Sequence, residues 1–464
     1  MKSNYKQVIS ALLLITTAAI SDAEPALPEG LSDEPELPIG LGFGVEPELN
    51  QQELTEKKAI SLWQQLGISG FTELRLGQRL HEPIEQKDTS LAELRLALEK
   101  NVYLEQATAK LSLDLLFDDV AQSQHNNLEA GSGWLDLREA WWRQSLAESI
   151  DIKIGRQILT WGVGDLVFIN DLFPKDWQSF LAGRDEQYLK APSDALRMGF
   201  YYDAININFV YTPRFDSDRS INGSRLSYYS AMNDEVVGNQ HVVLSDRPDR
   251  AWQEDEWALR LYRQFSSLEL SAYAYRGYWK SPAGFNPTTM QASYPALQVL
   301  GASARFAFNS GIVSAEVGYY DSLDDTAGTN PWVNNSEWRG LVAYERDIAK
   351  NTTLAVQYYL EVLQDYAAYR ETLMEAALPR DEFRHLLSLR FTRLALSQQL
   401  TMSVFAFYSP SDNDSYLRPK ITYKATDNFR IEAGMNMFAG KNSQTFFRQF
   451  ESNSNSYIAL RYSF

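Results

Sequence analysis

Apolar and polar residues alternate along most of the chain beyond Phe71. Between residues 110 and 117 (KLSLDLLF), leucine or phenylalanine occupies every odd position, while Lys110, Ser112 and Asp114 occupy even ones. A period of two residues is typical of β-strands with one apolar face. Repeated over the length of a chain, it indicates strands that turn one face to lipid and the other to a wet lumen.

Eighteen segments carry this pattern, and we predict a strand at each, with 16 strands as the fallback. They lie near residues 71–80, 90–98, 103–118, 134–143, 150–158, 195–202, 205–212, 256–265, 268–278, 298–308, 311–320, 336–346, 352–362, 383–393, 398–409, 415–425, 428–438 and 456–464.

The connections between these segments alternate between short and long. Tight turns at 203–204, 266–267, 309–310 and 426–427 separate long polar stretches at 159–194, 213–255, 279–297, 321–335, 363–382 and 439–455. Short periplasmic turns and long external loops are the rule for outer-membrane barrels. A soluble barrel or propeller is the alternative, but propeller blades would show an internal repeat, and the chain has none. The expected fold is therefore all-β, a transmembrane antiparallel barrel with periplasmic termini.

The N-terminal part divides into two segments before the barrel. Lys2 and Lys6, the apolar run 8–20 and a small-x-small site at 21–23 predict a signal peptide over 1–23, with a retained anchor as the alternative. Residues 24–66 form a Pro/Gly/acidic tail that ends in a short helix within 51–66. This tail is either disordered or a plug or docking peptide, and the barrel covers 67–464.

The C-terminal segment has its apolar residues in phase and ends on an aromatic residue. Ile458, Leu460, Tyr462 and Phe464 share one parity. This ending resembles the terminal strand that bacterial outer-membrane proteins present to the barrel-assembly machinery. We therefore expect that machinery, together with outer-membrane lipid and lipopolysaccharide, to be partners of the chain in the cell outer membrane.

Composition narrows the class of protein further. Aromatic residues make up 13% of the chain, which suits the two interfacial girdles of a barrel. The absence of cysteine excludes disulfides, thiolate metal sites and a lipoprotein anchor. A net charge of −17 argues against nucleic acid as a partner.

Nothing in the sequence predicts an enzyme. The four histidines form no recognisable pair, and no Gly-x-Ser-x-Gly, His-Glu-x-x-His or phosphate-loop motif is present. One acidic cluster lies at Asp321, Asp324 and Asp325. It lacks the spacing of a calcium-binding loop, and we interpret it as a solvated charge cluster. We expect no catalytic residue, no metal and no cofactor.

The inward parity of the strands is rich in basic residues. Fifteen basic and nine acidic residues share it, although the chain as a whole is acidic. Such residues either select for anions in the pore or pair across strands as a charge ladder in the wall. The residues assigned to the pore lining are Arg75, Arg79, Arg95, Arg138, Arg156, Arg197, Arg260, Arg305, Arg390 and Arg461. Of these, Arg156 is out of phase and needs a bulge at Gly155 to turn inward.

The stretch 159–194 is too long and too aromatic for a simple turn. Long structured loops in compact proteins are usually functional. We predict that this stretch folds into the lumen and sets the constriction, with an extracellular lid as the alternative. Its candidate constriction residues are Trp161, Asp165, Asp171, Phe173, Trp177 and Arg184.

Two short motifs flank this stretch. Gly-Arg-Gln at 155–157 and Asp-Ala-Leu-Arg at 194–197 resemble the alginate-export family of outer-membrane proteins. Gly-Arg-Gln with the following Trp161-Gly162 is also similar to a related group of proteobacterial porin-like barrels. The first resemblance implies an 18-stranded barrel with an Arg-lined pore that passes an anionic polysaccharide outward. Arg156 and Arg197 are the positions that match.

The expected function is passive passage of anionic solutes or of an acidic polysaccharide, gated by the stretch at about 159–194. Two alternatives stay open. One is a plugged barrel whose tail docks a periplasmic export partner, and the other is a channel for apolar compounds, suggested by the aromatic residues Phe168, Phe173, Trp177 and Phe180.

Overall fold

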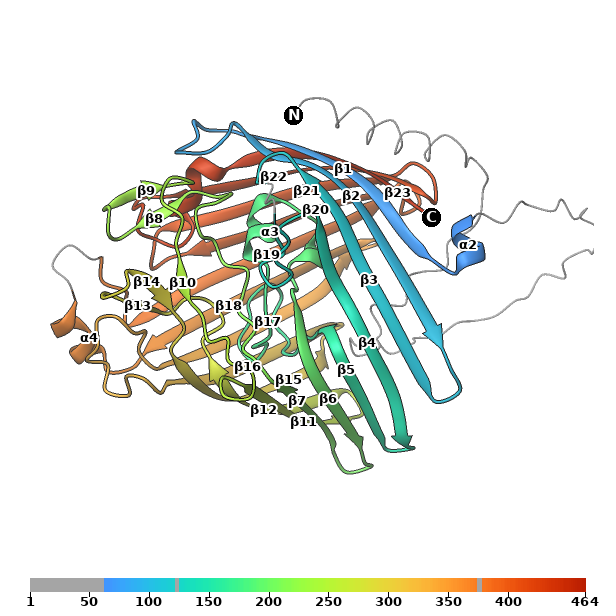
Figure 1. Ribbon diagram of the computed structural model, residues 1–464, viewed down its shortest axis with the longest axis horizontal. Helices are drawn as coiled ribbons and strands as arrows, with labels where there is room; N and C mark the ends of the chain where they lie inside the picture. Colours follow the sequence, from blue (N-terminus) through green and yellow to red (C-terminus); the bar gives the residue numbers. More distant parts are fainter. Residues whose placement is uncertain (1–61, 122–124, 374–377) are drawn as a thin grey trace, which may run out of the picture.

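The chain folds into one closed barrel. The structure, a computed structural model, describes residues 62–121, 125–373 and 378–464. An 18-stranded antiparallel sheet is closed by the pairing of β1 (Ser69–Arg79) with β23 (Asn455–Ser463) (Figure 1). Each of the remaining sixteen strands pairs with the barrel strand before it and the barrel strand after it in the chain. The predicted 18-stranded barrel is therefore confirmed. The predicted signal peptide and most of the tail lie outside the described residues.

The barrel strands follow one another around the wall in chain order. Between β1 and β23 they are β2 (Thr89–Tyr103), β3 (Ala107–Asp118), β4 (Leu135–Ala147), β5 (Ile150–Ile158), β6 (Pro192–Tyr201), β7 (Asn206–Thr212), β11 (Glu256–Phe265), β12 (Leu268–Tyr278), β15 (Ala296–Phe308), β16 (Gly311–Ser322), β17 (Glu337–Ala349), β18 (Thr352–Leu363), β19 (Phe383–Ala395), β20 (Leu400–Ser409), β21 (Asp414–Lys424) and β22 (Phe429–Gly440).

The predicted boundary between the second and third strands was wrong. β2 continues to Tyr103 and β3 begins at Ala107, whereas the pattern ended the one strand at residue 98 and began the next at residue 103. Glu99, Lys100 and Asn101 still pair with β3. They lie near the barrel rim, where both faces of a strand meet water, so the alternation fades while the backbone ladder continues.

The alternation of the sequence maps onto the two faces of the wall. Leu74, Leu111, Ile154, Val342 and Leu460 point outward, and each is more than a third exposed. The residues on the other parity are mostly buried inside the barrel. An apolar outer surface of this extent indicates a wall that faces lipid.

The two ends of the barrel differ. Short turns join the strands at one end, and the long connections lie at the other, except for the four-residue connection 410–413 (Figure 1). The termini of the barrel lie at the short-turn end, where the Gly70 and Phe464 backbones exchange two hydrogen bonds. The indole of Trp63, in α2 (Leu62–Leu66), stacks on the Phe464 ring with centroids 4.8 Å apart. None of the helices in the described part of the chain is long and apolar enough to cross a membrane.

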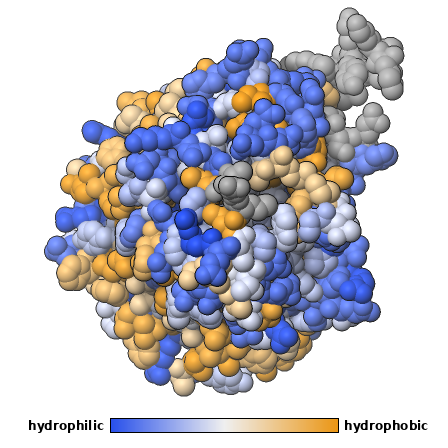
Figure 2. Space-filling view, turned by 90° about the vertical axis from the view of Figure 1, so that its left-hand side faces the viewer, coloured by the Kyte–Doolittle hydropathy of each residue, from blue (hydrophilic) through white to orange (hydrophobic). Residues whose placement is uncertain are grey.

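The long connections carry small elements of their own. These are α3 (Trp177–Ala182), η1 (Glu186–Tyr188), β8 (Tyr228–Ser230), β9 (Glu235–Val237), β10 (Ser245–Asp246), β13 (Gly284–Asn286), β14 (Gln291–Ser293), α4 (Tyr366–Thr372) and η2 (Arg448–Asn453). Figure 2 looks onto this end, where polar residues cover much of the surface and apolar residues gather along the lower rim.

A hydrophobic core occupies part of the barrel interior. It joins inward side chains of the wall, such as Val299, Tyr320 and Phe407, to Ile169 and Phe180 of the connection between β5 and β6. A water-filled lumen would expose these residues. The core therefore requires that the connection stay inside the barrel.

The outer face gives a direct test of the membrane assignment. Val342→Arg places a charge on the lipid-facing side of β17 and should lower the free energy of unfolding in lipid by about 2–4 kcal/mol. Ile348 lies on the same face near the short-turn end, and Ile348→Arg should lower the free energy of unfolding by only about 0–1 kcal/mol. Equilibrium unfolding from lipid vesicles measures both, and equal costs would contradict the assignment.

Candidate functional site

The connection 159–191, here called the inner segment, runs through the lumen. Figure 1 draws its helix α3 within the ring of strands. Two of its backbone amides, at Val163 and Asn170, donate to the carboxylate of Glu316 on β16 at 2.9 and 2.7 Å. The Asn170 side chain donates to the same carboxylate at 2.9 Å. Because β16 lies six strands from β5 around the wall, these bonds show that the segment crosses the barrel.

Two further strands hold the same stretch. The Gln357 side chain on β18 accepts from the Asp165 amide and donates to its carbonyl, both at 2.7 Å. Arg390 on β19 donates to the Asp165 carboxylate, with Nη2 at 2.9 Å. The Gln357 amide thus binds both backbone groups of Asp165, and the Arg390 guanidinium binds its side chain. These bonds leave the turn little freedom.

Gly162 permits the close approach to Glu316. Its φ of 85° lies in the left-handed region. A Cβ at this position would lie 2.9 Å from a carboxylate oxygen of Glu316. A larger residue would therefore be strained and would also push the segment away from its anchor.

The other end of the inner segment meets the wall through charges. Asp185 pairs with Arg430 at 2.8 Å and with Arg461 at 3.0 Å. Glu186 pairs with Arg390 at 3.3 Å and lies 3.8 Å from Arg418. Two carboxylates thus neutralise part of the basic inward face.

Arg184 and Tyr188 complete this attachment. The Arg184 guanidinium pairs with Glu93 of β2 at 2.7 Å. The Tyr188 ring contacts two guanidiniums, with Arg95 at 4.0 Å and Arg138 at 5.1 Å from its centroid. Cation–π contacts of this kind are stronger in a desolvated site than in water.

These charges change the titration of the acidic residues. Burial alone would raise the pKa of the Asp185 carboxyl, but Arg461, Arg430 and Lys420 outweigh it and hold that pKa well below its usual range. Burial would also raise the pKa of the Glu186 carboxyl, but Arg390 and Arg418 outweigh burial, and that pKa is lowered. Both carboxyls are therefore ionised at neutral pH and remain so in mild acid.

Most of the predicted pore arginines are paired. Six of them, Arg75, Arg79, Arg95, Arg138, Arg156 and Arg461, are less than a tenth exposed. Arg75 pairs with Glu73 at 3.0 Å and Glu432 at 3.1 Å and donates to the Gly183 carbonyl at 2.8 Å. Ion pairs also involve the residues Arg95, Arg138, Arg156, Arg260, Arg390 and Arg461. Some of these pairs join neighbouring strands, as the charge-ladder hypothesis predicts, and others lie within one strand or join the wall to the inner segment.

Arg156 is buried without the predicted bulge. It shares the parity of Ile154, which faces outward, yet it is 6% exposed. The pairing of β5 with β4 and β6 continues through Gly155 without a register shift, so the prediction of a bulge there was wrong. Gly155 instead has a φ of 117°. The Arg156 guanidinium donates to the Leu137 and Leu128 carbonyls at 2.7 and 2.6 Å. It serves to join the wall to the connection between β3 and β4.

Four predicted pore arginines are half-buried. Arg390, on β19, binds the inner segment, whereas Arg197, Arg260 and Arg305 lie on the alternate strands β6, β11 and β15. Arg260 pairs with Glu269 at 2.7 Å. Among the described residues, none forms a hydrogen bond or ion pair with the Arg305 side chain. This sector of the lumen, nearer the short turns, keeps accessible positive charge.

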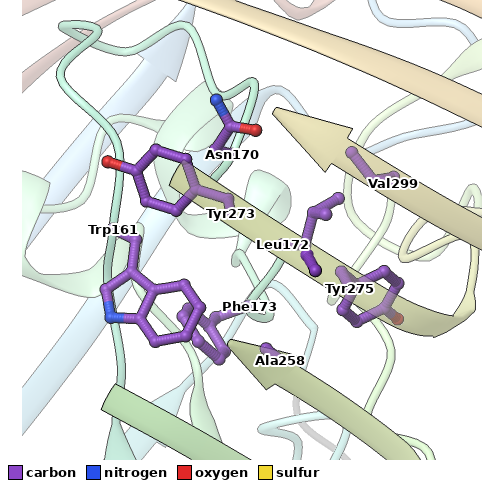
Figure 3. Close-up of a pocket in the computed structure, with 9 residues that line it drawn as sticks. Trp161, Asn170, Leu172, Phe173, Ala258, Tyr273, Tyr275 and Val299 are labelled. Atoms are coloured by element: carbon purple, nitrogen blue, oxygen red, sulfur yellow. The ribbon is translucent and has the colours of Figure 1, made fainter. Parts of the chain in front are cut away.

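The six predicted constriction residues all lie in the inner segment, in different surroundings. The Trp161 and Phe173 rings pack edge to face with centroids 4.9 Å apart, beside a cavity of about 10 Å³ that Figure 3 shows. Asp171 is buried and pairs with Lys175 at 3.0 Å, and the Trp177 indole donates to Asp218 at 3.1 Å. Asp165 and Arg184 bind the wall, as described above.

A second connection also enters the lumen. Residues 213–255, between β7 and β11, place Arg219 against Asp136 of β4 at 2.8 Å and against Asp176 of the inner segment at 3.2 Å. Arg225 pairs with Asp118 of β3. The sequence analysis treated this stretch only as a long polar connection, and its length was the one signal of a role. The two connections contact each other and the wall through these ion pairs.

The comparisons with known proteins agree with this architecture. No model of a known protein family and no curated protein matches the chain. Acinetobacter baumannii OccAB4 matches with a TM-score of 0.51 and 12% identity, over 86% of this chain and 97% of that chain. The fold is that of outer-membrane porins. The apolar outer face is the surface that such a barrel turns to the lipid of the outer membrane.

Two further structures of this type match over similar lengths. Pseudomonas aeruginosa OccK11 gives a TM-score of 0.48 and 9% identity, over 85% of this chain and 95% of that chain. A porin of Rhodopseudomonas blastica, in a triple mutant, gives 0.37 and 10%, over 86% of this chain and 99% of that chain.

Glu316 provides a test of how the inner segment is held. Glu316→Gln replaces an oxygen that accepts an N–H with a group that donates, and should cost about 1–3 kcal/mol of stability. Because the freed turn lies in the lumen, conductance fluctuations should increase. Single-channel recording and urea unfolding measure the two effects.

Glu269→Gln is the matched control, since Glu269 is an inward carboxylate that pairs with Arg260 and is not an anchor of the inner segment. Equal fluctuations in the two variants would contradict an anchoring role for Glu316.

The lowered pKa values predict a pH dependence with a definite sign. A carboxyl whose folded pKa is depressed stabilises its contacts above its ordinary pKa and loses them as pH falls through the lowered value. The attachment at Asp185 and Glu186 should therefore persist at pH 5 and be lost only below about pH 4. Conductance measured against pH checks this.

The double variant Asp185→Asn with Glu186→Gln should show at pH 7 the conductance that the native protein shows only in acid. Asp203→Asn, in an exposed turn, should leave the pH profile unchanged. An acid transition that survives in the double variant would overturn the assignment.

Proposed function

We propose that this protein is an outer-membrane channel through which anionic solutes diffuse. The observation that carries the proposal is the sector with Arg197, Arg260 and Arg305, which keeps accessible positive charge inside an acidic protein. Guanidinium groups in a narrow, low-dielectric passage raise the local concentration of anions.

The register of the wall supports this reading. Lys153 of β5 and Arg197 of β6 are direct cross-strand partners on the inward face. Like charges placed opposite each other destabilise a sheet, so a wall shaped only by stability would alternate the signs here. A passage for anions accounts for the placement.

The inner segment is proposed to set the constriction and to gate passage at about 159–194. It crosses the lumen and is held at Glu316, Gln357 and Arg390. The solute is either a small anion or an acidic polysaccharide, the latter implied by the resemblance of 155–157 and 194–197 to the alginate-export family. The Arg156 guanidinium pairs with Asp194 at 3.0 Å, so the arginine of the first motif contacts the first residue of the second.

The C-terminal strand is proposed to serve assembly. Phe464 directly follows β23, the strand that closes the barrel against β1, and its backbone bonds to that of Gly70. Recognition by the barrel-assembly machinery before closure would use this edge while it is still unpaired. Lipopolysaccharide is the proposed neighbour of the wall on the long-loop side.

Ion selectivity tests the proposed function. The triple variant Arg197→Gln, Arg260→Gln and Arg305→Gln should move the reversal potential in a salt gradient from anion-selective toward zero, because it removes three inward charges. Planar-bilayer recording of the refolded protein measures this shift. Short acidic oligosaccharides should block the current more strongly than neutral ones of equal length if the polysaccharide is the solute.

Arg263→Gln is the control, since Arg263 lies on β11 like Arg260 but is exposed and stacks on Phe265 with its Cζ 4.6 Å from the ring centroid. A native protein that conducts no ions, or that prefers cations, would contradict the proposal and favour a plugged scaffold that docks a periplasmic partner.

A further inference from the structure

A second feature of the lumen is a cavity between the inner segment and the wall. It has a volume of about 220 Å³ and is bounded by residues 166–181, by inward side chains of β17–β20 and by Phe446 and Phe447. Ten of its fourteen lining residues are apolar, and the other four are Arg339, Arg384, Tyr359 and Glu361. It lies apart from the basic sector near the short turns.

The apolar wall of this cavity is unusual for a barrel interior. The inward face of a channel is normally polar, because it meets water. Here Trp177, Phe180, Leu386 and Phe407 converge on one space. Apolar surface around a space of this size favours a ligand that also has an apolar body, since contact removes both surfaces from water.

The polar edge of the cavity favours an anionic head group. Two guanidiniums and one carboxylate line it, and the carboxylate, Glu361, is already paired with Arg380 and accepts from the Tyr359 hydroxyl at 3.0 Å. A cationic head group would have to compete with this guanidinium for Glu361. An anionic head group can instead bind one of the two arginines that line the cavity.

Arg384 is the guanidinium best placed to change partner. It pairs with Asp412 at 2.8 Å, and both side chains are partly exposed, at 18% and 23%. Arg339, by contrast, pairs with Glu337, whose side chain is 1% exposed. Displacing a partly solvated carboxylate costs less than displacing a buried one. An incoming carboxylate can therefore take the place of Asp412 at Arg384.

The volume limits the apolar body. A cavity of about 150 Å³ lined by similar side chains holds benzene. The present one is larger, so it has room for a single ring with a short acidic side chain.

We propose that this cavity binds an organic anion that carries one ring, with the ring among Phe180, Leu386 and Phe407 and the acid group at Arg384. The inference deepens the proposed function, on which it rests, by naming the class of anion that lodges beside the inner segment.

Binding to the refolded full chain in detergent micelles tests the inference without requiring conduction. Equilibrium dialysis compares phenylacetate, phenylacetamide, phenethylammonium and acetate. Phenylacetate should bind most tightly, because only it combines the ring with a negative charge. Tightest binding of the amide or of the ammonium compound would overturn the anion assignment, and binding of acetate equal to that of phenylacetate would overturn the role of the apolar wall.

Two variants separate the ring from the acid group. Arg384→Gln should weaken the binding of phenylacetate about tenfold or more, because a charged hydrogen bond is lost, and should leave the binding of phenylacetamide unchanged. Leu181→Trp should fill the cavity and abolish binding of both. Equal weakening of both ligands by Arg384→Gln would show a merely structural role and overturn the assignment of the head group.

Arg393→Gln is the matched control, since Arg393 lies on the same strand as Arg384 but is exposed on the opposite parity. The outcomes also distinguish the two proposals. An anion-selective channel that binds none of the four ligands overturns the cavity inference alone, whereas tight binding of phenylacetate by a barrel without anion selectivity overturns the proposed function alone.

Discussion

The arrangement of the lumen depends on the pairing of buried charges between the inner segment and the wall. A guanidinium or carboxylate removed from water is costly unless an opposite charge or hydrogen-bond partners compensate it. Asp185 and Glu186 lie among Arg390, Arg418, Arg430 and Arg461, and Arg184 lies against Glu93. Neither the basic wall nor the acidic segment is stable in this position without the other.

This pairing divides the lumen into two unequal sectors. Where the inner segment meets the wall, the arginines serve structure, and their charge is neutralised. Where it does not, on β6, β11 and β15, the arginines stay accessible. A count of inward charges cannot separate these two roles, because the same residue type on the same parity takes either one according to what packs against it.

The apolar side chains of the segment add a second constraint. Ile169, Phe173 and Phe180 pack against inward aromatic and aliphatic residues of the wall, so part of the barrel interior is a protein core. Such a core is close-packed and resists gradual displacement. The cavity beside it is a place where this packing stops short of the wall, next to groups that carry charge.

The sequence by itself determined the barrel, because alternation along each strand and the order of short and long connections are local properties. It therefore predicted 18 strands, their positions to within a few residues and the parity of Arg75, Arg95 and Arg461. It failed at the end of β2, where both faces meet water. It also could not reveal that Glu316, Gln357 and Arg390 hold one turn, or that Arg219 enters the lumen. Those contacts join residues that are distant in the chain, and only the closure of the wall around the two inward connections brings them together.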